Sequence, residues 1–169
     1  PYVSRAWAQA VEINMLAWYG HGEPDMVGEF EAANNVKFKS KYYAGGDNML
    51  ALIAQSPPGT YDIILSDGEF VQQLNTAGLI EEMNPADYPF DDMLYDDFKQ
   101  FPGHWKDGKL YSMMVRCGHL GVSYNTTAIS DEEAMSYKAF WKPEIKGKVG
   151  HFDWHLPSLG QMSLYNGNG

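Results

Sequence analysis

The alternation of strand-like and helix-like segments over the first half of the chain limits its fold more than any other feature. Strand-like segments occupy residues 11–18, 36–43 and 61–65. A helix-like segment follows each strand-like segment. The three helices are predicted to begin at Pro24, at Asp47 and near Glu69, and we expect Asp47 to cap its helix. Alternation of this kind predicts an α/β fold with an open, mostly parallel sheet flanked by helices.

The second half of the chain continues with strand-like and helix-like segments. Further strands are predicted at residues 109–116, 120–125 and 148–154. One helix is predicted to start at Ser130, and a final helix is predicted at residues 157–165. No internal repeat or low-complexity segment interrupts this pattern.

Charge and aromatic content narrow the classes of partner. The formal net charge is -10 at pH 7, so phosphates are repelled and nucleic acid is not expected as a partner. No apolar run approaches the roughly 20 residues of a membrane helix. Aromatic residues make up 14% of the chain, including 5 Trp and 11 Tyr. Because Trp and Tyr combine broad apolar faces with a polar tip, this surplus indicates a ligand pocket as well as a core.

Aromatic and acidic side chains follow two of the predicted strands. Trp18, Tyr19 and His21 come at the end of the first strand, and Asp67 and Glu69 follow the third. In open α/β sheets ligands bind beyond the carboxyl ends of the strands, so we expect these side chains to line a ligand crevice. The alternative for the two acids is structural, with Asp67 capping the next helix and Glu69 favouring its N-terminus.

Short motifs occur along the chain in an order that is typical of one family. They are Ala17-Trp18, Tyr61-Asp62-Ile63-Ile64, Ala77-Gly78-Leu79-Ile80, Lys109-Leu110-Tyr111-Ser112, Gly118 with Tyr124-Asn125, and FWKPEIKG at residues 140–147. With these motifs, residues 11–169 resemble the N-terminal half of the periplasmic spermidine/putrescine-binding proteins, within the type II solute-binding proteins of ABC importers. The FWKPEIKG motif is the most telling of the set.

The resemblance implies a periplasmic-binding-protein-like type II fold, in which two α/β lobes close over a ligand. Lobe I would span residues 11–115, and residues 116–169 would form the hinge and the start of lobe II. Family members are about twice as long, so we expect the chain to be truncated within lobe II. Residues 1–10 would be an extension or a signal-peptide remnant, since Ala8-Gln9-Ala10 fits a cleavage pattern.

The implied function is transport and not catalysis. The chain would be the substrate-binding component of an ABC importer, capturing a small amine-containing, polyamine-like solute for an inner-membrane permease. It would act in the periplasm as a monomer, without a cofactor. The sequence contains no Gly-x-Ser-x-Gly, Gly-x-Gly-x-x-Gly or His-Glu-x-x-His motif, so an α/β enzyme with an unrecognised Asp/His site is the alternative.

The resemblance also assigns residues to a ligand pocket. Family pockets hold the alkyl chain of the ligand between aromatic faces and fix its ammonium groups with carboxylates. Trp18 occupies the tryptophan position of the family, and the other aligned pocket positions are Tyr19, His21, Asp67 and Glu69.

Other positions depart from the polyamine-binding pattern. Trp154 and Pro157 replace an acidic pair at the start of a second-lobe helix, while Asp153 is kept beside them. Cys117 replaces a hinge tryptophan, and the adjacent Arg116 would suit a carboxylate or a hinge salt bridge. Arg116, Asp153 and Trp154 therefore join the predicted ligand residues. An amino acid or an opine-like zwitterion fits this set about as well as a polyamine.

The segment HFDWH raises the question of a metal ion. On a strand, His151, Asp153 and His155 would share one face, and their side chains are ligands for Zn²⁺ and other transition metals. A bend before Pro157 would separate them and leave the histidines in ordinary hydrogen bonds. We therefore expect no metal site and keep a metal-ion receptor as an alternative.

Overall fold

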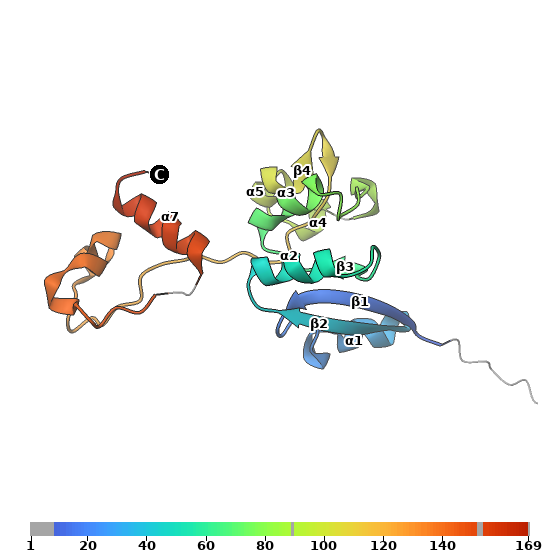
Figure 1. Ribbon diagram of the computed structural model, residues 1–169, viewed down its shortest axis with the longest axis horizontal. Helices are drawn as coiled ribbons and strands as arrows, with labels where there is room; N and C mark the ends of the chain where they lie inside the picture. The colour runs from blue at the N-terminus through green and yellow to red at the C-terminus, as the bar shows by residue number, and fades with distance from the viewer. Residues whose placement is uncertain (1–8, 89, 152–153, 169) are drawn as a thin grey trace, which may run out of the picture. The chain divides into compact units, whose positions relative to one another are not determined.

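The computed structural model describes residues 9–88, 90–151 and 154–168, and the chain separates into two compact units (Figure 1). The first unit ends at Val115 and the second begins at Arg116. The sequence placed the boundary between lobe I and the hinge at this point, and the assignment of the two units to two lobes stays a prediction. No described helix is both long enough and apolar enough to cross a membrane.

A three-stranded parallel sheet organises the first unit. Its strands are β1 (Val11–Trp18), β2 (Val36–Tyr43) and β3 (Ile63–Ile64), in the order β2-β1-β3. The register pairs Val11 with Val36 and Trp18 with Tyr43, so β1 and β2 end side by side. β3 is shorter than predicted, although the amide of Leu65 still donates to the Leu16 carbonyl just beyond it. This sheet confirms the predicted α/β class.

Three helices follow the three strands, as the alternation predicts. They are α1 (Pro24–Asn34), α2 (Gly46–Gln55) and α3 (Gly68–Thr76). Figure 1 shows α1 on one side of β1 and β2 and α2 on the other. The prediction that Asp47 caps α2 is wrong, because the chain enters this helix through Gly45 at a φ of 81° and Asp47 lies in the first turn.

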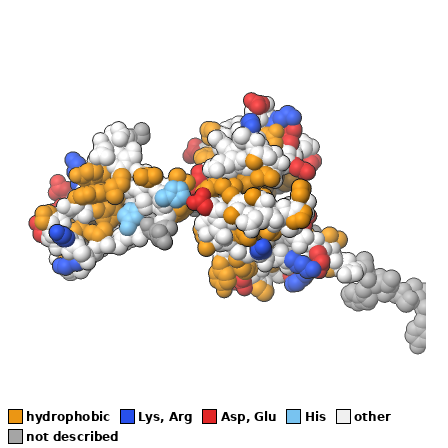
Figure 2. Space-filling view, viewed as in Figure 1, with side chains coloured by type: hydrophobic (Ala, Val, Ile, Leu, Met, Phe, Trp, Pro, Cys, Tyr) orange, Lys and Arg blue, Asp and Glu red, His pale blue; other side chains and the backbone are white. Residues whose placement is uncertain are grey.

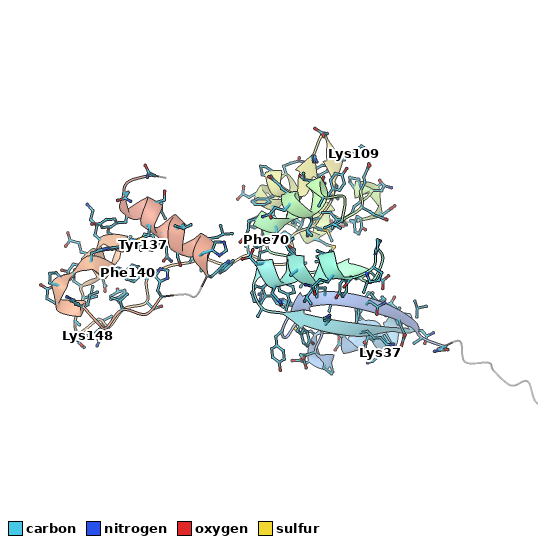
Figure 3. The ribbon with its side chains drawn as sticks, viewed as in Figure 1. Lys37, Phe70, Lys109, Tyr137, Phe140 and Lys148 are labelled. Atoms are coloured by element: carbon cyan, nitrogen blue, oxygen red, sulfur yellow. The ribbon has the colours of Figure 1, made fainter. Side chains whose placement is uncertain are left out.

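The core of the first unit lies between the sheet and the helices α2 and α3. Leu16 and Met49 are completely buried, and Leu74 is buried with them. Phe70 of α3 lies against the start of α2, where a β-carbon at Gly46 would be 2.0 Å from the Phe70 ring atom Cε2 (Figure 3). Any larger residue at position 46 would displace Phe70, so this glycine permits the close approach of α3 to α2.

Short elements and a β-hairpin complete the first unit. They are η1 (Pro85–Asp87), α4 (Phe90–Met93), α5 (Asp96–Lys99), η2 (Pro102–His104), β4 (Trp105–Lys106) and β5 (Lys109–Leu110). Asp107 and Gly108 both have positive φ, which suits a two-residue hairpin turn. The strand predicted at 109–116 is wrong beyond Leu110, because β4 offers only two residues for β5 to pair with.

The second unit is mostly helical in its described residues. Its elements are α6 (Asp131–Ala134), η3 (Tyr137–Trp141), η4 (Pro143–Ile145) and α7 (His155–Tyr165). Ser130 caps α6 through a reciprocal capping box with Glu133, at the predicted helix start. The strand predicted at 120–125 does not form. The described residues of 148–154 form none either, because this unit has no described strand to pair with them.

Ring contacts hold the second unit together. The ring centroids of Tyr137 and Phe140 lie 6.0 Å apart (Figure 3). Trp141 stacks on Tyr165 with a centroid distance of 4.2 Å, which joins η3 to α7. Figure 2 shows hydrophobic side chains grouped on the surface of this unit. The exposed apolar residues of α7 are Leu156, Leu159, Met162 and Leu164. The described part of this unit therefore depends more on ring contacts than on a closed core.

Replacing Leu16 with alanine tests the core of the first unit. Leu16 is 0% exposed, so we expect Leu16→Ala to lower the free energy of unfolding by about 2–5 kcal/mol, through lost burial and a residual cavity. Urea unfolding followed by circular dichroism measures this change. Leu79→Ala is the matched control, because Leu79 is 44% exposed and its truncation should cost about 0.5 kcal/mol or less. Equal losses in the two variants would contradict the assigned core.

Candidate functional site

Two aromatic residues lie side by side at the carboxyl edge of the parallel sheet. Trp18 ends β1 and Tyr43 ends β2, and the two residues are direct neighbours in the sheet. Their ring centroids lie 4.9 Å apart, with an angle of 48° between the ring planes. The Tyr43 hydroxyl donates to the Leu65 carbonyl oxygen over 2.5 Å, just beyond β3. Tyr43 is buried, with 4% of its surface exposed. The pair is therefore fixed by contacts within β1 and β2 and with the residue that follows β3.

Trp18 combines a packed ring with an unsatisfied donor. Its ring packs against the core and the residue is half-buried. The indole Nε1 is buried, and no described residue accepts a hydrogen bond from it. Leaving a buried N–H without an acceptor costs about 1–3 kcal/mol. An acceptor supplied from outside the described residues would therefore be stabilising.

Asp67 and Glu69 stand at the start of α3. Asp67 is the N-cap residue and is half-buried, but its side chain makes no capping hydrogen bond to the helix. The side chain of Asp67 therefore does not cap α3, contrary to the structural alternative considered for it. Glu69 is exposed in the first turn of α3, where the helix dipole favours a carboxylate.

The structure separates Tyr19 from Trp18. Successive residues of a strand point to opposite faces of the sheet, so Tyr42 lies on the face away from Tyr43. Tyr19 packs edge-on against Tyr42, with ring centroids 5.3 Å apart, and is 77% exposed. His21 is half-buried, and its amide donates to the Trp18 carbonyl. The two aromatic residues at the end of β1 therefore serve opposite faces of the sheet.

Two residues beside Tyr19 were missed by the sequence analysis. The Tyr42 hydroxyl donates to Glu23 Oε1 over 2.7 Å, and this bond to a carboxylate raises the pKa of Tyr42. Glu23 is the N-cap residue of α1 but makes no capping bond. Ser, Thr, Asp or Asn is usual at this position, so a glutamate directly before Pro24 was a signal that its carboxylate has another partner.

The second unit contains the other predicted ligand residues. Arg116 is exposed at the start of this unit. Trp154 is half-buried and is the N-cap residue of α7. Asp153 lies outside the described residues. The ligand roles of these three residues therefore stay predictions.

The histidines of the HFDWH segment have separate surroundings. The ring nitrogens of His151 lie 2.7 Å from Gln161 Oε1 and 3.1 Å from Ser158 Oγ, both on α7. His155 is exposed at the first position of α7. Within the described part of the chain, no group of three or more His, Cys, Asp or Glu side chains could hold a metal ion. Because Asp153 lies outside that part, the metal alternative stays a prediction.

A cavity lies elsewhere in the first unit. It has a volume of about 240 Å³ and lies between α3 and the β4–β5 hairpin. Its lining includes Val71, Asn75, His104, Trp105, Lys106 and Tyr111. None of the predicted ligand residues lines it, so this cavity does not support the predicted crevice.

His104 is the buried titratable group of this cavity. It is 6% exposed, and its Nδ1 lies 2.6 Å from Ser112 Oγ. Its Nε2 is buried, and no described residue pairs with it. Burial disfavours the imidazolium and lowers the pKa of His104. The folded protein therefore holds this imidazole in its neutral form at neutral pH.

Acid should destabilise the protein through His104. Its pKa is lowered in the folded state, so as the pH falls below about 6.5 the unfolded chain binds a proton that the folded chain excludes. The free energy of unfolding is therefore highest above about pH 6.5 and falls as the pH decreases, until the pH reaches the pKa of His104 in the folded protein. Urea unfolding on both sides of about pH 6.5 measures the change. His104→Gln should reduce this pH dependence, and an unchanged dependence would contradict the assignment.

Known proteins match most of the chain. The family model described as bacterial extracellular solute-binding protein matches residues 25–167. The spermidine/putrescine-binding periplasmic protein of Escherichia coli (strain K12) is 24% identical over 168 residues, covering 95% of this chain and 47% of the relative. The chain therefore spans about half the length of that relative.

Two solved structures share the fold. A spermidine/putrescine ABC transporter protein from Listeria monocytogenes aligns with a TM-score of 0.67 at 21% identity, covering 80% of this chain and 41% of that one. A spermidine/putrescine ABC transporter substrate-binding protein from Streptococcus pneumoniae aligns with a TM-score of 0.58 at 14% identity, with the same coverage. These alignments confirm the predicted type II fold for part of a lobed protein.

Proposed function

The chain belongs to the bacterial extracellular solute-binding protein family, and on this premise we propose that it captures a small amine-containing solute for an ABC importer. The solute would bind at the carboxyl edge of the β2-β1-β3 sheet. The relatives named above are spermidine/putrescine-binding proteins, so a polyamine-like solute is the finer form of the proposal.

The Trp18–Tyr43 pair carries this proposal. Tyr43 is only 4% exposed and supports the ring of Trp18, which is half-buried at the sheet edge. The π face of Trp18 attracts an ammonium group placed within about 6 Å of the ring centroid. Asp67 follows β3 at the same edge and adds a half-buried carboxylate. A carboxylate and an ammonium group form a charge-assisted hydrogen bond. The edge therefore supplies both contacts that a cationic amine needs.

The net charge of the chain supports a cationic or zwitterionic solute. The chain has 22 acidic residues against 12 lysines and arginines, which gives the formal charge of -10. A negative field attracts cations towards the surface and repels anions. Amine-containing solutes are therefore favoured over phosphorylated or polyanionic ones.

We place this activity in the periplasm, next to a membrane permease that receives the solute. The name of the Escherichia coli relative supports this location. The protein would act as a receptor and release the solute unchanged. Recovery of intact solute from saturated protein tests this role, whereas conversion to a product would identify an α/β enzyme.

A zwitterionic solute is the second candidate, and Trp18 Nε1 is the observation that favours it. This buried N–H has no described acceptor. Ammonium groups carry only donors, so a polyamine cannot satisfy it. The carboxylate of an amino acid or an opine-like compound can accept this hydrogen bond. The two candidates therefore differ in the group that reaches Trp18.

Truncation of Trp18 tests the site itself. We expect Trp18→Ala to weaken amine binding by about 1–3 kcal/mol, because stacking and apolar burial are lost. Isothermal titration calorimetry with spermidine and putrescine measures the change. Trp105→Ala is the control, since Trp105 lines the separate cavity and its loss should leave the affinity unchanged. Wild-type affinity in Trp18→Ala would contradict the site.

Putrescine and 4-aminobutyrate separate the two candidate solutes, because a carboxylate replaces one ammonium group on a chain of equal carbon number. If the solute is a polyamine, putrescine should bind more tightly than 4-aminobutyrate. If the solute is a zwitterion, 4-aminobutyrate should bind more tightly than putrescine. Trp18→Phe keeps a ring but removes the N–H, so it should weaken 4-aminobutyrate binding by about tenfold or more and leave putrescine nearly unchanged. Equal effects on both compounds would contradict a role for Nε1.

A further inference from the structure

The loop between β1 and α1 is shaped by two glycines. Gly20 has a φ of 95°, which side-chain-bearing residues rarely adopt, and it turns the chain after β1. Gly22 lies so close to β2 that a β-carbon there would be 2.0 Å from Ser40 Oγ. Because the loop lies directly on β2, the next residue, Glu23, reaches the side of Tyr42.

Tyr19, Tyr42 and Glu23 form a corner on the α1 face of the sheet, which we name the ammonium corner. The planes of its two rings meet at 69°, with centroids 5.3 Å apart. The Tyr42 hydroxyl donates to Glu23 Oε1 over 2.7 Å, which holds the carboxylate beside the rings. Tyr19 is 77% exposed and Glu23 is half-buried, so solvent reaches the corner.

No described lysine or arginine pairs with the carboxylate of the ammonium corner. Two lysines of the neighbouring strand β2 are engaged with other acids. Lys37 contacts Glu31 and Lys39 contacts Glu12, each over 2.6 Å. Glu23 Oε2 therefore has no ion-pair partner within the part of the chain that the structure describes.

The positive end of the α1 helix dipole disfavours a cation at the ammonium corner, but nearby acidic side chains outweigh this effect. A helix N-terminus contributes about half a positive charge. Glu23 at the N-cap and Asp25 in the first turn supply two acidic side chains. Pro24 also removes one of the N–H donors that would face the loop. The corner is therefore electronegative on balance.

We propose that the ammonium corner binds an ammonium group of the solute. This inference rests on the proposed function, and it identifies the recognised group and a charged residue that recognises it. The faces of Tyr19 and Tyr42 attract an organic cation, and Glu23 Oε2 accepts an N–H···O hydrogen bond from it. A carboxylate or phosphate in the same place would be repelled by Glu23.

Calorimetric titration of the complete protein with putrescine tests the ammonium corner. Glu23→Gln removes the charge and nearly keeps the shape, so we expect it to weaken putrescine binding by about tenfold or more. Glu29→Gln is the matched control, because it removes the same charge from an exposed position on the same helix. It should change the affinity by less than about twofold.

Tyr42→Phe distinguishes a ligand contact from structural support. It keeps the ring and the Glu23 charge but removes the bond between them. If Glu23 contacts the solute, Glu23→Gln lowers the affinity far more than Tyr42→Phe and also reduces the salt dependence of binding. If Glu23 only supports the loop, both variants lose melting temperature and affinity equally. The second pattern would overturn the proposal.

Failure of the ammonium corner and failure of the proposed function give different results. If Glu23→Gln binds putrescine as the wild type does while Trp18→Ala does not, the corner is wrong and the proposed function stands. If the wild type binds neither putrescine nor any other amine, both are wrong.

Discussion

The parallel pairing of β1 with β2 is the constraint on which the rest of the first unit depends. Its register buries Leu16 in the core and ends both strands at one edge, with Trp18 beside Tyr43. Because side chains alternate along a strand, a slip of one residue would send Tyr43 to the α1 face and bring Tyr42 into the core. The register that closes the core therefore also decides which aromatic ring packs beside Trp18 at that edge.

The first half of the fold could be predicted because its patterns are long and local. Residues 11–18 and 36–43 form strands with the predicted bounds, and α1 begins at Pro24. Residues 111–116 and 120–125 show similar patterns but form no strand. A strand needs a partner within reach, and a local pattern contains no information about that partner. Prediction therefore failed where pairing, and not propensity, decides the structure.

The candidate site could be predicted only in part for a similar reason. The position of Trp18 at the carboxyl edge follows from the order of strands and helices. The separation of Tyr19 from Trp18 was not predicted, since both were expected in one crevice, although the alternation of side chains at the end of β1 explains it. The contact between Tyr42 and Glu23 could not be predicted, because it depends on how closely the loop approaches β2 through Gly22. The glutamate before Pro24 indicates that its carboxylate has a partner other than the helix, but sequence spacing does not identify Tyr42 as that partner.

A crystal structure of the complete protein with bound putrescine is the measurement that tests the central claim most directly. We predict electron density for the solute against the ring face of Trp18, with an ammonium group beside an acidic side chain at the carboxyl edge of the sheet. Putrescine bound in the cavity lined by His104 and Trp105, with the edge empty, would contradict the claim.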